Sequence, residues 1–145
     1  MADPGPQAVL LDTNVFVSAI RRPLRQTDTF RLLVRLLAPG EFRLVGNEVL
    51  AREYLRYARA FPSPTASALA IRLLEATELV PVEERFLRAC APHFPPDTAA
   101  DCVHAATCLQ TGAILVSNDK HFQAIRRAGL VPVLTATEAI RRWVR

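Results

Sequence analysis

Three aspartates stand where an apolar run ends or a predicted helix begins. Asp12 follows the apolar residues 9–11, Asp119 follows the apolar segment 113–117, and Asp101 lies near the start of a predicted helix. Carboxylates that gather in one place repel each other unless a cation lies among them, and hard oxygen ligands suit Mg²⁺ or Mn²⁺. Their types and positions therefore point to metal-assisted chemistry on a phosphate.

Each aspartate also has a purely structural explanation. Asp12 could cap the turn that follows it, and Asp119 could cap the helix that it precedes. Asp101 could be a first-turn residue that the helix dipole favours. Three independent structural roles at one place are a less simple explanation than one shared site.

Short apolar runs alternate with amphipathic stretches along the chain. Periodicity predicts strands over residues 9–11, 42–45, 79–82, 113–117 and 131–134. It predicts helices over residues 27–37, 48–60, 65–76, 83–90, 119–128 and 137–144, with a further helix that ends near residue 110. This alternation predicts a three-layer α/β/α fold with a central parallel sheet of about five strands. With no internal repeat or long linker, we expect one domain over residues 1–145.

Ligands of open parallel sheets bind beyond the carboxyl ends of the strands, which is where Asp12 and Asp119 are predicted. The helix that carries Asp101 should follow an irregular segment, residues 91–96, because three prolines there remove hydrogen-bond donors. Asp97 is predicted to cap this helix and Gly112 to end it.

The bulk composition narrows the class of protein. The net charge is +4 and the pI about 9.5, with Lys120 as the only lysine. Such a balance favours a polyanionic partner, although compositional bias of the genome would give the same balance. No apolar run approaches the roughly 20 residues needed to span a membrane, and the first residues do not resemble a secretory signal. We expect a cytoplasmic protein whose cysteines (Cys90, Cys102 and Cys108) stay reduced.

Three segments carry a resemblance to a known family. Residues 10–19 (LLDTNVFVSA) resemble the opening of PIN-domain proteins, in which an apolar strand, Asp, Thr or Ser, and Asn precede a short apolar helix. Residues 101–122 (DCVHAATCLQTGAILVSNDKHF) resemble the second half of that family. Residues 47–54 (NEVLAREY) resemble the intervening helix, which carries the remaining acid. The resemblance covers nearly the whole chain, in the expected order.

The resemblance implies a quartet of acids that binds Mg²⁺ or Mn²⁺: Asp12, Glu53, Asp101 and Asp119. Asp12 and Asp101 are the expected inner ligands, while the other two act through water or hold a second ion. Glu48 is the alternative to Glu53, because the two lie roughly 140° apart around one helix and only one can face the cluster. Tyr54, which follows Glu53, favours Glu53.

Further residues have supporting roles by the same resemblance. Ser117 is placed to hydrogen-bond a metal-bound water or a neighbouring carboxylate, and Thr13 and Asn14 are placed to orient Asp12. We interpret His104 as a residue that packs within its helix and His121 as a surface residue, rather than as general bases.

The resemblance implies a metal-dependent endoribonuclease whose products carry a 5′-phosphate and a 3′-hydroxyl. Similarity to VapC-like proteins implies the toxin of a type II toxin–antitoxin pair, with RNA as substrate, an antitoxin as partner and a homodimer as the assembly. The arginines expected to follow the RNA backbone are Arg21, Arg22, Arg25, Arg52, Arg56 and Arg59.

Other classes of function remain to be weighed. A PIN-fold module could bind RNA or protein with weak or no nuclease activity. A phosphatase of the haloacid-dehalogenase type would need a second Asp where Asn14 stands, and a receiver domain would need an acid just before the first strand. Neither of these two patterns fits the sequence.

Overall fold

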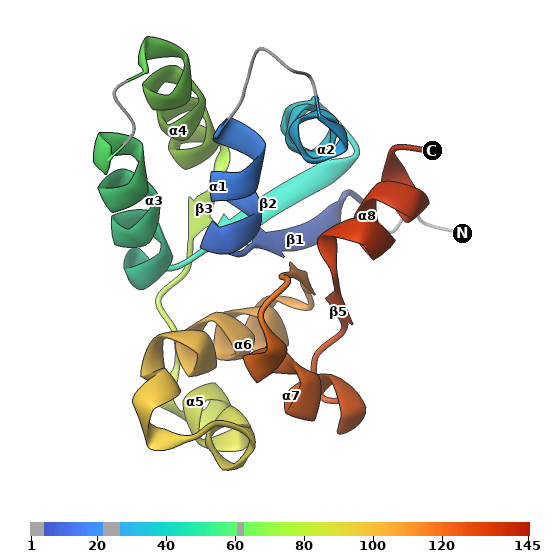
Figure 1. Ribbon diagram of the computed structural model, residues 1–145. Helices are drawn as coiled ribbons and strands as arrows, with labels where there is room; N and C mark the ends of the chain where they lie inside the picture. The colour runs from blue at the N-terminus through green and yellow to red at the C-terminus, as the bar shows by residue number, and fades with distance from the viewer. Residues whose placement is uncertain (1–4, 22–26, 61–62) are drawn as a thin grey trace.

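The computed structural model describes residues 5–21, 27–60 and 63–145, and a parallel sheet runs through its centre (Figure 1). The strands follow the order β3-β2-β1-β4-β5, and every neighbouring pair is parallel. They are β1 (Gln7–Leu11), β2 (Phe42–Gly46), β3 (Glu78–Leu79), β4 (Ile114–Val116) and β5 (Val133–Leu134). The predicted five-stranded parallel sheet is confirmed.

Helices cover both faces of this sheet, which makes three layers (Figure 1). One layer consists of α1 (Thr13–Ile20), α2 (Asp28–Leu37), α3 (Glu48–Ala60) and α4 (Pro64–Ala76). Helix α8 (Ala136–Trp143) packs against α2. The opposite layer consists of α5 (Glu84–Cys90), α6 (Ala99–Thr111) and α7 (Gln123–Arg127). The predicted three-layer α/β/α class is therefore confirmed.

The pairing of β1 with β4 in the middle of the sheet places the polar residues that follow these two strands next to each other. Both strands are almost fully apolar and buried, as expected for parallel strands covered by helices on both faces. Leu11 pairs with Val116 in register, so the residues that follow the two strands, Asp12 and Ser117, emerge side by side. The Asp12 backbone N–H continues the ladder by donating to the Val116 carbonyl (2.9 Å).

The start of α6 differs from the prediction. Asp97 does not cap the helix: it lies inside a 3₁₀ turn, Pro96–Thr98, and α6 begins at Ala99. The reason is local, because Pro96 opens the turn without needing a backbone N–H, and Thr98 directs its hydroxyl back to the Pro95 carbonyl (2.7 Å). Asp101 nevertheless lies in the first turn of α6, as expected.

Other boundaries shift for similar reasons. The segment predicted to be irregular contains a short 3₁₀ turn, Ala91–His93, ahead of the one just described. The helix predicted over residues 119–128 is divided into a 3₁₀ turn, Lys120–Phe122, and α7. The strands β3 and β5 are shorter than predicted; Pro81 lies within the expected range of one and Pro132 within that of the other, and proline cannot donate to a strand ladder.

Gly46 ends β2 at a crowded place. A side-chain carbon there would lie 3.0 Å from the side chains of Leu50 and Thr77, so α3 packs closely against the end of the strand. Within the described ranges, no helix has both the length and the apolar character needed to cross a membrane. The three cysteines are free thiols.

Candidate active site

Asp12 lies where β1 ends and α1 begins. Its carboxylate accepts one hydrogen bond from the Thr13 backbone N–H (2.8 Å) and another from the Ser117 hydroxyl (2.6 Å). Burial raises the pKa of Asp12 above its ordinary value, and the hydrogen bond from Ser117 offsets part of that effect. Asp12 therefore caps α1, as the structural explanation expected, and also faces the end of β4.

Glu53 reaches the same place from α3. The Thr13 hydroxyl donates to Glu53 Oε2 (2.5 Å), and His104 Nε2 lies 3.3 Å from Glu53 Oε1. Burial acts to raise the pKa of Glu53, but the hydrogen bonds from His104 and Thr13 outweigh it and the pKa lies below its ordinary value. The carboxylate of Glu53 is thus held in its charged form.

Glu48, the alternative acid on α3, points elsewhere. Its side chain is 83% exposed and lies 3.5 Å from Arg52, one turn along the helix. The side chain of Glu53 is 21% exposed and contacts Thr13 and His104 inside the site. Of the two glutamates, the structure brings only Glu53 into the cluster.

A buried chain of hydrogen bonds orients His104 behind Glu53. The Asn47 side-chain oxygen accepts from the Leu50 backbone N–H (2.9 Å), so its amide nitrogen faces His104 Nδ1 (3.1 Å). Because the amide donates, Nδ1 must accept, and the ring hydrogen is placed on Nε2, where it points to Glu53. His104 is buried, as predicted, but its contact with Glu53 was missed. Its position three residues after Asp101, on the same side of α6, was the available signal.

A second group of side chains forms at the start of α6 and the end of β4. His121 Nδ1 lies 2.9 Å from Asp101 Oδ2 and 3.2 Å from Asp119 Oδ1. Asp119 also caps the turn that follows it, by accepting from the His121 backbone N–H (2.9 Å). Burial raises the pKa of Asp101, as does the nearby charge of Asp119, while the hydrogen bond to His121 opposes the rise. His121 is 41% exposed, but it bridges two acids, which its assignment as a surface residue did not anticipate.

We call the four acids Asp12, Glu53, Asp101 and Asp119 the acidic cluster. Each half of the cluster forms a group with one histidine, and within a group the possible ligand atoms lie within 4.8 Å of one another. The groups are Asp12, Glu53 and His104, and Asp101, Asp119 and His121. Ser117 joins the groups, because its hydroxyl oxygen donates to Asp12 and accepts from the Asp119 backbone N–H (3.0 Å). Asp12 thus lies in one group with Glu53 and Asp101 in the other with Asp119, while the charge of Asp101 still acts on Asp12.

Two other predicted residues lie next to the cluster. Thr13 contacts both Asp12 and Glu53, so it positions one more acid than expected. Asn14 Oδ1 lies 3.5 Å from the Asn118 backbone nitrogen, which places its contact on the loop after β4.

The arginines predicted to follow an RNA backbone fall in different places. Those that line hollows beside the cluster are Arg21, Arg52 and Arg56. Arg59 is exposed in the last turn of α3, and Arg22 and Arg25 lie outside the described residues.

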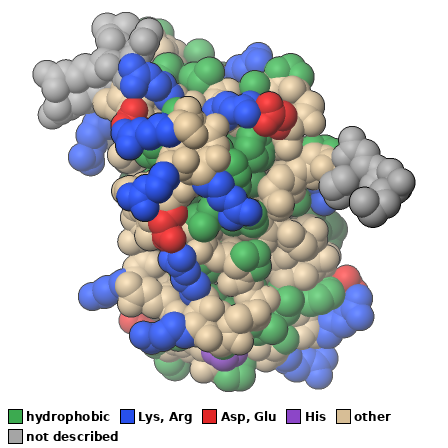
Figure 2. Space-filling model, turned by 90° about the vertical axis from the view of Figure 1, so that its right-hand side faces the viewer, with side chains coloured by type: hydrophobic (Ala, Val, Ile, Leu, Met, Phe, Trp, Pro, Cys, Tyr) green, Lys and Arg blue, Asp and Glu red, His purple; other side chains and the backbone are tan. Residues whose placement is uncertain are grey.

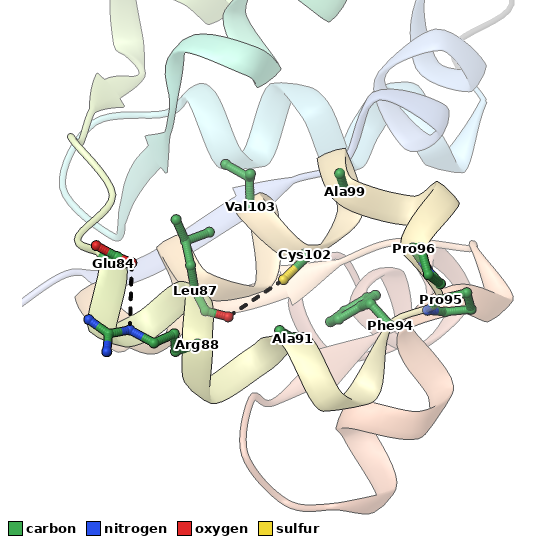
Figure 3. Close-up of a pocket in the computed structure, with 10 residues that line it drawn as sticks. All are labelled: Glu84, Leu87, Arg88, Ala91, Phe94, Pro95, Pro96, Ala99, Cys102 and Val103. Atoms are coloured by element: carbon green, nitrogen blue, oxygen red, sulfur yellow. Dashed lines mark hydrogen bonds and ion pairs between the residues drawn. The ribbon is translucent and has the colours of Figure 1, made fainter.

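A larger hollow, of about 560 Å³, lies between α5 and α6 (Figure 3). Its lining is mostly apolar, and Glu84, the acid at its rim, pairs with Arg88 (3.7 Å). Cys102 in its wall directs its sulfur to the Leu87 carbonyl (3.8 Å). This lining offers no group of acids comparable with the cluster.

The fold and the acidic cluster define an α/β protein with a candidate cation site at the carboxyl edge of its parallel sheet. The chain belongs to the PIN-domain family, whose model matches residues 9–128. No curated protein matches the chain significantly.

Solved structures with a similar fold include a chain of VapBC2 from Rickettsia felis, in a complex bound to a DNA fragment from its promoter. The TM-score is 0.65 at 14% identity, over 89% of this chain and 98% of that one. For VapBC-1 from nontypeable Haemophilus influenzae, the TM-score is 0.57 at 18% identity, over 90% of this chain and 99% of that one. For FitAB bound to a DNA fragment, the TM-score is 0.56 at 21% identity, over 88% of this chain and 94% of that one. At these identities the similarity concerns the fold.

Proposed function

We propose that this chain is a divalent-metal-dependent endoribonuclease that hydrolyses RNA phosphodiester bonds. The observation that carries the proposal is the acidic cluster: two carboxylates at strand ends and two from helices, gathered at one sheet edge in a PIN domain. Proteins of this family are generally metal-dependent nucleases.

The donor set fits Mg²⁺ or Mn²⁺. Four carboxylates supply hard oxygen ligands, which these ions prefer. The bound ions would neutralise charge on the attacked phosphate and make a water molecule more acidic. The residues that would hold them are Asp12 with Glu53 on one side and Asp101 with Asp119 on the other.

The chain's own groups prepare these ligands. Ser117 and Thr13 hold the carboxylate of Asp12 in place, and His104 and Thr13 keep Glu53 charged. His121 lies between Asp101 and Asp119, with its Nδ1 2.9 Å from one carboxylate and 3.2 Å from the other.

We further propose that the chain is the toxin of a toxin–antitoxin pair, a VapC-like protein that forms a homodimer and is restrained by an antitoxin. The support is the similarity in fold to VapBC and FitAB chains, each solved as part of a complex. If a small reading frame adjoins the gene, co-expression with its product tests this role. Stable co-purification and relief of growth arrest are expected, and normal growth on expression of the chain alone would contradict it.

The nuclease is tested with protein stripped of metal and incubated with RNA, with and without added Mg²⁺ or Mn²⁺. Cleavage that depends on the ion and leaves 5′-phosphate ends is expected. Undiminished cleavage in excess EDTA would overturn the metal mechanism. RNA binding without cleavage at any ion concentration would favour the alternative, a PIN-fold binding module.

A further inference from the structure

A hollow of about 310 Å³ opens between α1 and α3. The residues that line it are Asn14, Val17, Ser18, Arg21 and Tyr57. Asn14 is two residues from Asp12, and Tyr57 lies one helical turn beyond Glu53 on α3. The hollow is therefore formed by the same two helices that begin at Asp12 and carry Glu53.

A second hollow, of about 390 Å³, lies on the other side of α3 and includes Glu53 itself, with Arg52 and Arg56 in its wall. Helix α3 packs against both α1 and α6, so it separates the two hollows. A polynucleotide with one phosphate over the cluster would extend its neighbouring nucleotides towards these two places.

The lining of the hollow between α1 and α3 suits one nucleotide. Tyr57 offers an aromatic ring for stacking, and the Arg56 guanidinium lies 5.2 Å from the centre of that ring. Base stacking on aromatic rings is the usual means of holding unpaired nucleotides. Arg21 offers a planar group for a phosphate, and Asn14 and Ser18 offer polar atoms for a base edge.

The dimensions agree with this occupant. Asn14 and Arg21 stand at the two ends of α1, seven residues apart, which corresponds to about 10 Å along the axis. That length accommodates one nucleotide and the phosphate that follows it. Volumes of this size lie near the lower end of those found for small-ligand sites.

The depth of the cluster favours an unpaired strand. Asp12 is only 6% exposed, so a phosphate must come close to a recessed carboxylate. The phosphates of a duplex lie on a rigid, convex surface, whereas a single strand can bend inward and turn its bases outward into side hollows.

The basic face around α2 and α8 is a weaker candidate for this contact (Figure 2). Several of its arginines are already neutralised by acids: Arg31 and Arg145 by Asp28, Arg35 by Glu41 and Arg126 by Glu138. Arg56 lies over the Tyr57 ring and its charge acts on Glu53. Among the ion pairs of the described residues none involves Arg21, so the charge of Arg21 is available to a phosphate.

We propose that the hollow between α1 and α3 is a subsite for one unpaired nucleotide of single-stranded RNA, with its base stacked on Tyr57 and its phosphate bound by Arg21. This inference rests on the proposed ribonuclease function and extends it to the residues that hold a nucleotide next to the attacked phosphate.

The test measures binding in an Asp12→Asn background, which prevents cleavage. The probe is an eight-nucleotide single-stranded RNA that contains 2-aminopurine, and the comparison is its duplex. We expect the duplex to bind at least about tenfold more weakly, and Tyr57→Ala and Arg21→Ala each to weaken single-strand binding by about tenfold. Quenching of 2-aminopurine should disappear in Tyr57→Ala and persist in Tyr57→Phe, which keeps the ring.

Arg72→Ala is the matched control, because Arg72 is an exposed arginine on α4 and its loss changes the net charge equally. Thermal melting checks that each variant folds, and Arg21→Ala carries the test if Tyr57→Ala does not fold. Equal binding of duplex and single strand, or equal behaviour of Arg21→Ala and Arg72→Ala, would overturn the subsite. Wild-type protein that binds as expected but never cleaves would instead overturn the nuclease proposal alone.

Discussion

Ser117 and Asp12 are 105 residues apart in the sequence, yet the Ser117 hydroxyl oxygen lies 2.6 Å from a carboxylate oxygen of Asp12. The same hydroxyl accepts a hydrogen bond from the Asp119 backbone. One small side chain at the end of β4 thus contacts both halves of the acidic cluster. We therefore expect the loss of this hydroxyl to disturb both halves of the cluster.

Ser117→Ala should weaken metal binding and cleavage by about tenfold, because the carboxylate of Asp12 loses the partner that orients it. The measurement is the Mg²⁺ dependence of cleavage. Ser67→Ala, which removes a hydroxyl from α4, is the control. An unchanged Mg²⁺ requirement would show that Asp12 is held well enough by Thr13.

Asp101→Asn should abolish cleavage and stabilise the metal-free protein. Because burial and Asp119 raise the pKa of Asp101, the folded state favours its protonated form. The stability that this carboxyl contributes is therefore present at acidic pH and is lost as the pH rises through its folded pKa. In EDTA at pH 7, the variant should melt at a higher temperature than the wild type, and the difference should shrink towards pH 4. A lower melting temperature at pH 7 would mean that the bond to His121 outweighs the repulsion.

Glu53→Gln should reduce cleavage far more than Glu48→Gln, by at least about tenfold at limiting Mg²⁺. Glu53 contacts Thr13 and His104 within the site, whereas Glu48 faces solvent beside Arg52. Saturating Mg²⁺ should narrow the difference if Glu53 acts through water. If Glu48→Gln reduced cleavage more than Glu53→Gln at both Mg²⁺ concentrations, Glu48 would be the fourth ligand instead.

Asn47→Ser should keep the start of α3 but release His104. A serine can still accept from the Leu50 backbone, yet it lacks the amide that donates to His104 Nδ1. Nitrogen NMR should show the Nε2–H form of His104 in the metal-free wild type and a mixture of tautomers in the variant. We expect cleavage to fall by about tenfold. An unchanged spectrum would remove Asn47 from the site.

The parallel class of the sheet and the positions of the strand-end acids followed from local patterns, whereas the order of the strands was seen only in the structure. Apolar runs that end in Asp12 or close to Asp119 identify the carboxyl edge without any long-range information. The choice of Glu53 over Glu48 rested on the resemblance, because Tyr54 follows Glu53. In the structure, the Tyr54 hydroxyl donates to the Leu11 carbonyl, which fixes the rotation of α3.

The contacts of the two histidines could not be predicted from local sequence patterns. His104 meets Glu53 across 51 residues of sequence, and His121 meets Asp101 across 20, so each depends on how separate elements pack. The start of α6 was misplaced because the turn after Pro95 delays the helix. Rules based on single residues identify possible helix caps, but they do not predict when a neighbouring turn forms instead.

The place of β1 between β2 and β4 has a consequence for synthesis of the protein. A chain leaves the ribosome amino terminus first, and domains begin to fold as they emerge. Asp12 and Glu53 come out early, while one edge of β1 waits for β4, which cannot pair until residues 114–116 have emerged. A nascent or prematurely terminated chain therefore carries half of the acids without the arrangement that unites them.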